Sequence, residues 1–363
     1  MPHFQPLFNS THSTATFSAI PHPFEAVAPL ACGLFVVWAL SRVWYPSSRR
    51  RGAPAPPECV VVRSQTIDDI LSCPKDASRP LSVRLAGIAL PDALQLSVDR
   101  LRKQVECELG DWELAVQQEA RAHLDDLTLA RYVTGAPPMR MEALAMFRAA
   151  MAWRVHQGVN SIYNELHPMR KGSADISARQ KAVFDHFYCG AGGVARDGVP
   201  YFVQRLGRAD FEGFASDPEL GELMKHAWVA HLEMVFRAAR AASAEAKQLR
   251  YTLIIVDVVG ITLRSLRHGM PLIRYCSEVG LANFPEGTDR IFVVNAPSII
   301  AAMWNLVAPI LPEATQKKIN IVSSSATLET LTREIDPSEL LKFLGGEKPE
   351  EQSPMTRALP LKA

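Results

Sequence analysis

The most informative hydrophobic pattern in the chain lies around residue 300. A short run rich in branched residues, Ile291–Val294, predicts a buried strand. An Asn-Ala-Pro sequence interrupts the run, and Ser298 is a suitable N-cap for a helix that we expect over Ile299–Leu311. Asn305 is the only strongly polar residue of this helix, whereas a surface helix needs a polar face. The helix must be buried on all sides or cover something apolar outside the protein's own core. We take the second alternative as the hypothesis: the helix is the lid of a lipid cavity.

Strand-like and helix-like patterns alternate from residue 199 to residue 322. The run Thr252–Val256 is continuously apolar, which is typical of a strand covered on both faces. The pattern predicts strands over Val199–Leu206, Thr252–Val256, Ile291–Val294 and Ile319–Val322, and helices over Asp217–Lys247 (with Leu220, Met224, Trp228 and Val235 inward) and Leu263–Val279. This alternation predicts an α/β domain with a largely parallel sheet.

The residues before this domain carry a helical pattern. Met139–Gln157 places Leu144, Phe147, Met151 and Val155 on one face, at steps of three and four. We expect a second helix before it, over Asp111–Tyr132, so that residues 111–170 form a small helical subdomain. Residues 58–110 remain an unassigned connector, in which Asp92–Glu108 is a possible helix and Cys59–Arg63 a possible short strand.

The N-terminal region is rich in proline and hydroxyl residues, which is typical of disordered sequence. Residues 1–57 are therefore expected to be a disordered tail. Residues 26–45 contain an uncharged run just short of a membrane span, followed by aromatic residues and arginines. A single-pass anchor that leaves the rest of the chain on the cytoplasmic face of a membrane is the first interpretation. An organelle-targeting segment and an apolar disordered tail remain open. Residues 348–363 are expected to be a loose tail.

Composition and charge exclude several classes of function. The chain has 363 residues, 48% of them hydrophobic, and a net charge of +1, which gives no reason to expect nucleic acid as a partner. Its six cysteines are scattered without a C-x-x-C pair, which fits a reducing compartment and argues against a structural zinc site.

Three possible motifs are interpreted as structural. The glycine-rich Cys189–Gly193 lacks the Lys-Ser/Thr of a phosphate loop and is expected to be a plain turn. His231 and Glu233 form an isolated H-x-E, without the further ligands of a zinc site. A serine hydrolase is disfavoured, because the chain has no G-x-S-x-G sequence and Ser323–Ser325 lacks a glycine frame.

Five segments, taken together and in order, resemble the CRAL-TRIO lipid-binding family, which includes phosphatidylinositol and tocopherol transfer proteins. They are LARYVTGAPPMRMEALAMFRAAMAWR (Leu129–Arg154), GVPYFVQRLGRAD (Gly198–Asp210), TLIIVDVVGI (Thr252–Ile261), FPEGTDRIFVVNAPSIIAAMW (Phe284–Trp304) and FLGGE (Phe343–Glu347). The resemblance covers roughly residues 115–347 and implies a CRAL-TRIO lipid-binding domain over residues 175–347, preceded by the helical subdomain.

The resemblance also implies a mobile gate helix that closes a lipid cavity. The gate falls on the lid helix, with cavity and gate residues Ile299, Ile300, Met303, Trp304, Val307 and Ile310. Gly345 and Gly346 are interpreted as a hinge that supports the gate, because glycine permits a tight backbone turn.

Head-group residues are implied only where positions match the family. In members that bind phosphatidylinositol, the corresponding positions are Glu286, Thr315 and Lys318. Lysine can pair with a phosphodiester, threonine can donate to a phosphate oxygen, and glutamate can accept from inositol hydroxyls. Two family arginines are replaced here, by Ala136 and by Gly287, so one phosphate contact is missing.

The sequence thus predicts a non-catalytic protein that binds one lipid, with phosphatidylinositol as the candidate, and transfers or presents it at membranes. Its expected partners are the lipid and a membrane surface, with no cofactor and no metal. The alternative is a membrane-tethered interaction module whose cavity is vestigial.

Overall fold

The core of the protein is a five-stranded sheet of order β1-β2-β3-β4-β5, in which only the β1–β2 pair is antiparallel. The computed structural model describes residues 90–136, 141–166, 182, 186–187, 189–300, 304 and 316–349. The strands are β1 (Cys189–Val194), β2 (Pro200–Gln204), β3 (Thr252–Asp257), β4 (Thr288–Val294) and β5 (Ile319–Ile321). The prediction of an α/β fold with a largely parallel sheet is confirmed.

Strand β1 corrects one prediction, because the glycine-rich segment expected to be a turn is a strand. A Cβ atom on Gly192 would lie 2.1 Å from a ring carbon of Tyr201 on the neighbouring strand. The glycine therefore leaves room for the tyrosine ring to pack directly on the backbone of β1. A bulge between Ala191 and Gly193 interrupts the pairing, as is common in edge strands.

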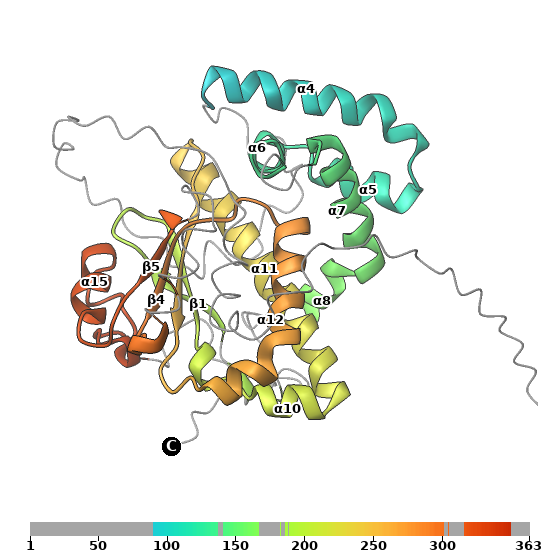
Figure 1. The fold of residues 1–363 in the computed structure, drawn as a ribbon. Helices are drawn as coiled ribbons and strands as arrows, with labels where there is room; N and C mark the ends of the chain where they lie inside the picture. Colours follow the sequence, from blue (N-terminus) through green and yellow to red (C-terminus); the bar gives the residue numbers. More distant parts are fainter. Residues whose placement is uncertain are drawn as a thin grey trace, which may run out of the picture. The chain divides into compact units, whose positions relative to one another are not determined.

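The two faces of the sheet pack against different helices (Figure 1). Alternate residues such as Phe202, Ile254 and Ile291 join a core with α10 (Phe211–Ser216), α11 (Pro218–Ala246) and α12 (Leu263–Asn283). Residues one position away face the opposite core, which includes Leu331 of α15 (Thr327–Glu334) and the short turn η5 (Lys342–Leu344). Another 3-10 turn, η3 (Leu206–Arg208), follows β2. The helices predicted at 217–247 and 263–279 are confirmed, the second extending to Asn283.

The residues before the sheet form a separate core, made of helices. These are α4 (Asp92–Glu108), η1 (Leu109–Asp111), α5 (Leu114–Ala122), α6 (Asp126–Gly135), α7 (Ala143–Gln157) and α8 (Val159–Leu166). Val98 and Leu101 of α4 are buried with α6 and α7, so α4 belongs to this helical core. On α7 the predicted residues Phe147 and Met151 are buried, whereas Leu144 and Val155 are only partly buried.

The single helix predicted over 111–132 is wrong, since the chain breaks between α5 and α6. The side chain of Asp125 accepts a hydrogen bond from the backbone N–H of Thr128 at 2.9 Å and so caps a new helix. Its other oxygen receives the guanidinium of Arg240 on α11 at 2.5 Å. The break between α5 and α6 is therefore stabilised by a residue 115 positions away, which the local sequence does not show.

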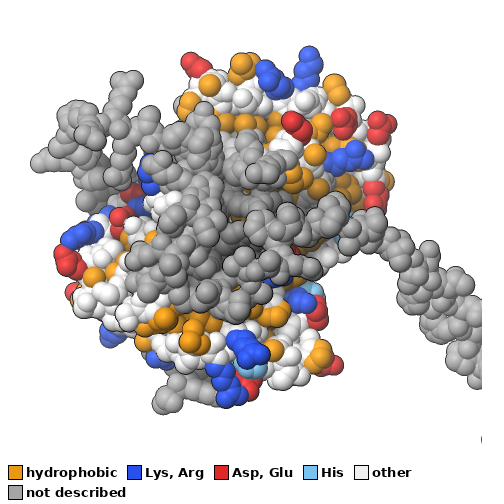
Figure 2. Space-filling view, in the orientation of Figure 1, with side chains coloured by type: hydrophobic (Ala, Val, Ile, Leu, Met, Phe, Trp, Pro, Cys, Tyr) orange, Lys and Arg blue, Asp and Glu red, His pale blue; other side chains and the backbone are white. Residues whose placement is uncertain are grey.

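The surface of the described residues carries charges of both signs. Figure 2 shows acidic and basic side chains interspersed on this face rather than gathered into patches of one sign. No helix among the described residues is long and apolar enough to cross a membrane. The possible anchor at residues 26–45 lies outside the described residues.

Candidate functional site

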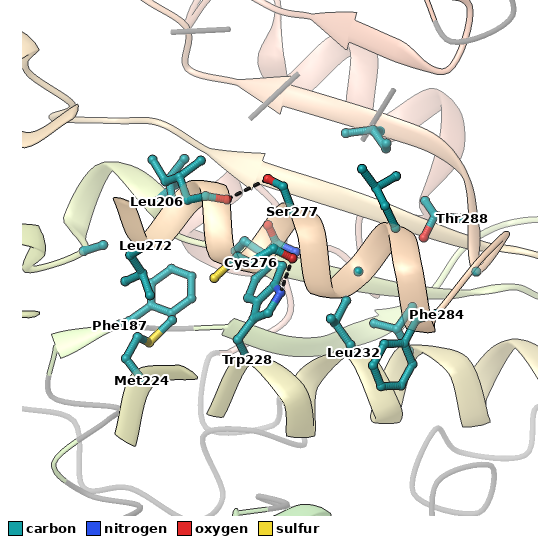
Figure 3. A pocket seen from close by; sticks show the side chains of 18 of the residues that line it. Phe187, Leu206, Met224, Trp228, Leu232, Leu272, Cys276, Ser277, Phe284 and Thr288 are labelled. Atoms are coloured by element: carbon teal, nitrogen blue, oxygen red, sulfur yellow. Dashed lines mark hydrogen bonds between the residues drawn. The ribbon is translucent and has the colours of Figure 1, made fainter. Parts of the chain in front are cut away.

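An apolar cavity of about 150 Å³ lies between the sheet and helices α10, α11 and α12. Figure 3 shows side chains from α11, such as Trp228, and from α12, such as Cys276, lying along it. The inward α11 residues predicted from the sequence include three that line it. The lining is Phe187, Gln204, Leu206, Ala209, Phe211, Phe214, Met224, Trp228, Leu232, Val235, Phe236, Leu272, Ile273, Cys276, Ser277, Gly280, Leu281, Phe284, Glu286, Gly287, Thr288 and Ile291.

Two of the polar side chains that line the cavity are satisfied by the protein itself. The indole Nε1 of Trp228 donates to the backbone carbonyl of Cys276 at 2.9 Å, so that α11 is tied to α12. The Ser277 hydroxyl donates to the carbonyl of Ile273 at 2.6 Å. Both hydrogen bonds are drawn in Figure 3. These residues therefore present mainly apolar surface to the cavity.

Glu286 supplies a carboxylate at one end of the cavity. The residue is 3% exposed, and its backbone has a φ of 54°, in the left-handed region that a non-glycine residue rarely adopts. The ammonium of Lys318 lies 3.4 Å from Oε2, whereas Oε1 has no hydrogen-bond partner among the described residues. Burial raises the pKa of Glu286, and the Lys318 charge opposes that rise. The structure thus brings together two of the three predicted head-group residues.

The third predicted head-group residue, Thr315, lies outside the described residues. The neighbouring hydroxyls are supplied by Thr252 and Thr288, whose Oγ1 atoms are 3.0 Å apart. Thr252 also donates its hydroxyl to the carbonyl of Gly287 at 3.1 Å. Of these two threonines, Thr288 lines the cavity beside Glu286 and Gly287, and Thr252 lies behind it.

Helix α6 holds the Glu286 turn in place through Arg131 and Tyr132, two residues that the sequence did not predict to be near the site. Arg131 is fully buried and donates to the carbonyls of Glu286 and, at 2.7 Å, of Arg250. The hydroxyl of Tyr132 donates to the carbonyl of Asn283 at 3.1 Å. A hydrogen bond between residues this far apart in the chain leaves no local pattern. The one available signal was an adjacent arginine and tyrosine between the apolar residues Ala130 and Val133.

The predicted gate residues are only partly within the described residues. Ile299 is half exposed, Ile300 is buried in the core beneath α11 and α12, and Trp304 is partly buried against that core. None of these three residues lines the cavity. Met303, Val307 and Ile310 lie outside the described residues, so the gate stays a prediction.

The two glycines predicted as a hinge lie in a tight turn after η5. Gly345 has a φ of 93°, a conformation that favours glycine. A Cβ on Gly346 would lie 2.1 Å from the carbonyl oxygen of Leu340, so a side chain has no room there. Steric constraints thus require glycine at both positions. The role of the two glycines as a hinge stays a prediction.

Comparison with known proteins matches residues 185–346 to the CRAL/TRIO domain. The Sec14 cytosolic factor of Schizosaccharomyces pombe is 27% identical over 250 residues, covering 68% of this chain and 81% of that protein. The phosphatidylinositol/phosphatidylcholine transfer protein SFH9 of Arabidopsis thaliana is 25% identical over 227 residues, which cover 62% of this chain but only 37% of the plant protein. Among solved structures, that of Sfh5 has a TM-score of 0.45 at 12% identity, covering 76% of this chain and 94% of the other.

Proposed function

The chain belongs to the CRAL-TRIO family, and on that premise we propose that it binds one lipid in the cavity and transfers or presents it at a membrane surface. The observation that carries the proposal is an apolar cavity with a buried, partly unsatisfied carboxylate at one end. Such a cavity suits an amphiphile, because the walls bury hydrocarbon while the polar end selects the head group. Burial of apolar surface contributes about 25 cal/mol per Å² to binding.

Phosphatidylinositol is the head group that we propose. Inositol hydroxyls can donate to the unpartnered oxygen of Glu286, and the phosphodiester can accept from Lys318. Both side chains are largely buried, so these interactions are little weakened by solvent. The matched plant relative is named for transfer of phosphatidylinositol and phosphatidylcholine, which supports a phospholipid ligand.

The size of the cavity implies that its walls move when a phospholipid enters. A volume of about 150 Å³ is below the roughly 300–1,000 Å³ of pockets that bind drug-sized ligands, and a phospholipid is larger than such ligands. We propose that the segment from Ile299 to Ile310 is the gate that opens, supported by Gly345 and Gly346. Contact with a membrane would favour the open form, since apolar surface exposed by opening would then face lipid instead of water.

Lipid identification on the purified protein tests the proposed function. Native mass spectrometry is expected to show one phospholipid per chain, and extraction followed by lipid analysis should identify phosphatidylinositol. Added phosphatidylinositol vesicles are expected to raise the Tm, because a ligand that binds only the folded state stabilises it. A protein that carries no stoichiometric lipid and gains no stability would favour the interaction module with a vestigial cavity.

A further inference from the structure

The polar side chain of Gln204 lines the cavity away from Glu286. Gln204 is the last residue of β2 and lies two positions after Phe202, so both face the cavity side of the sheet. Its amide nitrogen lies 3.2 Å from Nε2 of His231 on α11. Gln204 is 8% exposed and His231 is 3% exposed. A buried amide at the wall of an apolar cavity is therefore held from behind by a buried imidazole.

The pair satisfies only part of its own hydrogen-bonding capacity. Burial lowers the pKa of His231 to about 4, so the ring is neutral near pH 7 and has one N–H and one bare nitrogen. Nε2 is used by Gln204, whereas Nδ1 is buried with no partner in the described part of the chain. Whichever way the amide is turned, His231 engages only one of its two polar ends. His231 does not line the cavity, whereas Gln204 does, so the amide end that His231 leaves unused is the one that a bound molecule can meet.

Two other polar side chains along the cavity, in contrast to Gln204, have their donors satisfied by the backbone. Trp228 and Ser277 each donate to a backbone carbonyl of α12. The side-chain amide of Gln204 instead lines the cavity, and His231 is its one hydrogen-bond partner among the described residues. A plain acyl chain passing Gln204 would leave its amide buried against hydrocarbon, which is unfavourable.

The register of the sheet gives the distance between Gln204 and the end of the cavity at Glu286 and Thr288. Gln204 pairs with Val256 on β3, and Val256 pairs with Val293 on β4. Thr288, which lines the head-group end, lies five residues before Val293 on the same strand. At about 3.3 Å per residue, the two ends are roughly 16 Å apart along the strands. A head group bound at Glu286 therefore does not reach Gln204, and a different part of the ligand must meet it.

We propose that Gln204, held by His231, is a second polar subsite, and that the ligand is a lipid with a hydrogen-bonding oxygen, such as a hydroxyl, on its apolar part. The proposal rests on the proposed function, because it requires the lipid to occupy this cavity. Gln204 contacts the ligand oxygen, and His231 orients the amide toward the cavity. The subsite would select among lipids by the position of the oxygen along the chain, independently of the head group.

A positional series of lipids tests the subsite. The probes are phosphatidylinositols that differ in one of their two acyl chains. This chain is unsubstituted in one probe, and in the others it has a single hydroxyl near the carbonyl, at the middle or near the methyl end. Uptake from vesicles by the full-length protein is expected to be about fivefold better for one isomer than for the unsubstituted lipid, the gain of one hydrogen bond. Gln204→Leu is expected to remove this preference and to keep uptake of the unsubstituted lipid.

Matched variants separate the outcomes. Gln248→Leu changes an exposed glutamine and is expected to keep the preference. His231→Leu frees the amide and should weaken discrimination among the isomers; an unchanged preference would remove His231 from the proposal. Equal uptake of all the lipids, or a preference that survives in Gln204→Leu, would overturn the subsite and leave lipid binding intact. A protein that takes up none of the probes would overturn both the subsite and the proposed phosphatidylinositol function.

Discussion

Glu286 and Lys318 form the ion pair on which the polar end of the cavity depends. The carboxylate is buried and uses one oxygen for Lys318, while its backbone is held in a left-handed conformation. Removal of one partner from a buried pair leaves the other charge uncompensated, which costs more than loss of an exposed pair. Substitution of either residue is therefore expected to be costly.

Lys318→Ala is expected to reduce uptake of phosphatidylinositol about tenfold, because a hydrogen bond to a charged group contributes roughly 1.5–3 kcal/mol. Fluorescent phosphatidylinositol transfer between vesicles measures the change. Lys317→Ala, at the exposed neighbouring lysine, is the matched control and should transfer normally. Unchanged uptake by Lys318→Ala would show that the head group does not bind at Glu286.

The buried His231 also makes stability depend on pH. Its pKa is about 4 in the folded protein, against an ordinary value of 6.5, so between these values only the unfolded chain binds the proton. Stability is therefore retained above pH 6.5 and lost as the pH falls toward 4. Between pH 7 and pH 5 the wild type is expected to lose about 2 kcal/mol more than His231→Leu. Urea unfolding at the two pH values measures this; parallel losses would contradict it.

Helix α6 is the element that positions the Glu286 end of the cavity. Arg131 and Tyr132 bind backbone carbonyls on either side of Pro285, and Gly135 packs against Pro285 itself. A Cβ at Gly135 would lie 2.6 Å from the Cβ of Pro285. The helical core and the Pro285–Glu286 turn are thus in direct contact through one face of a short helix.

Gly135→Ala is expected to push the Pro285–Glu286 turn away from α6 and to destabilise the protein by about 1–3 kcal/mol. Phosphatidylinositol uptake should fall with it, because Glu286 moves relative to Lys318. Gly110→Ala is the matched control, since a Cβ there meets nothing within 4 Å. The control should be close to neutral or slightly stabilising. Equal unfolding free energies for the two variants would show that the contact at Gly135 is not restrictive.

At the scale of the whole molecule, a buried ion pair joins the helical core to the sheet-covering helix α11. Arg154 of α7 donates to Glu233 of α11 and to Glu119 of α5, each at 2.7 Å. Although burial alone would raise the pKa of Glu233, Arg154 and Arg237 hold it well below its ordinary value. The H-x-E glutamate is thus part of a structural ion pair that connects the two cores.

Arg154→Met is expected to lower the free energy of unfolding by about 3–5 kcal/mol, because Glu233 would remain buried without its main partner. Arg148→Met, on the exposed side of the same helix, should cost less than about 1 kcal/mol. Urea unfolding of both variants compares them. A loss for Arg154→Met no larger than that of the control would contradict the importance of the pair.

The sequence by itself determined the elements whose burial follows a regular local pattern. The apolar run at Thr252 predicted β3, and the spacing of Met224, Trp228 and Val235 predicted the inward face of α11, because such periodicities follow from strand and helix geometry. The resemblance to the family pointed to Glu286 and Lys318. The predicted roles of Thr315, the gate residues and the glycine hinge remain predictions.

Only the tertiary structure decided which distant groups meet. The helix break at Asp125 has Arg240 as its partner, the glycines of β1 make room for Tyr201, and Arg131 reaches Glu286 across 155 residues of sequence. The approach of Gln204 to His231 is of the same kind, since it joins a strand to a helix. Local periodicity reports which face of an element is buried. It does not report what that face packs against, because packing partners are chosen by the fold as a whole.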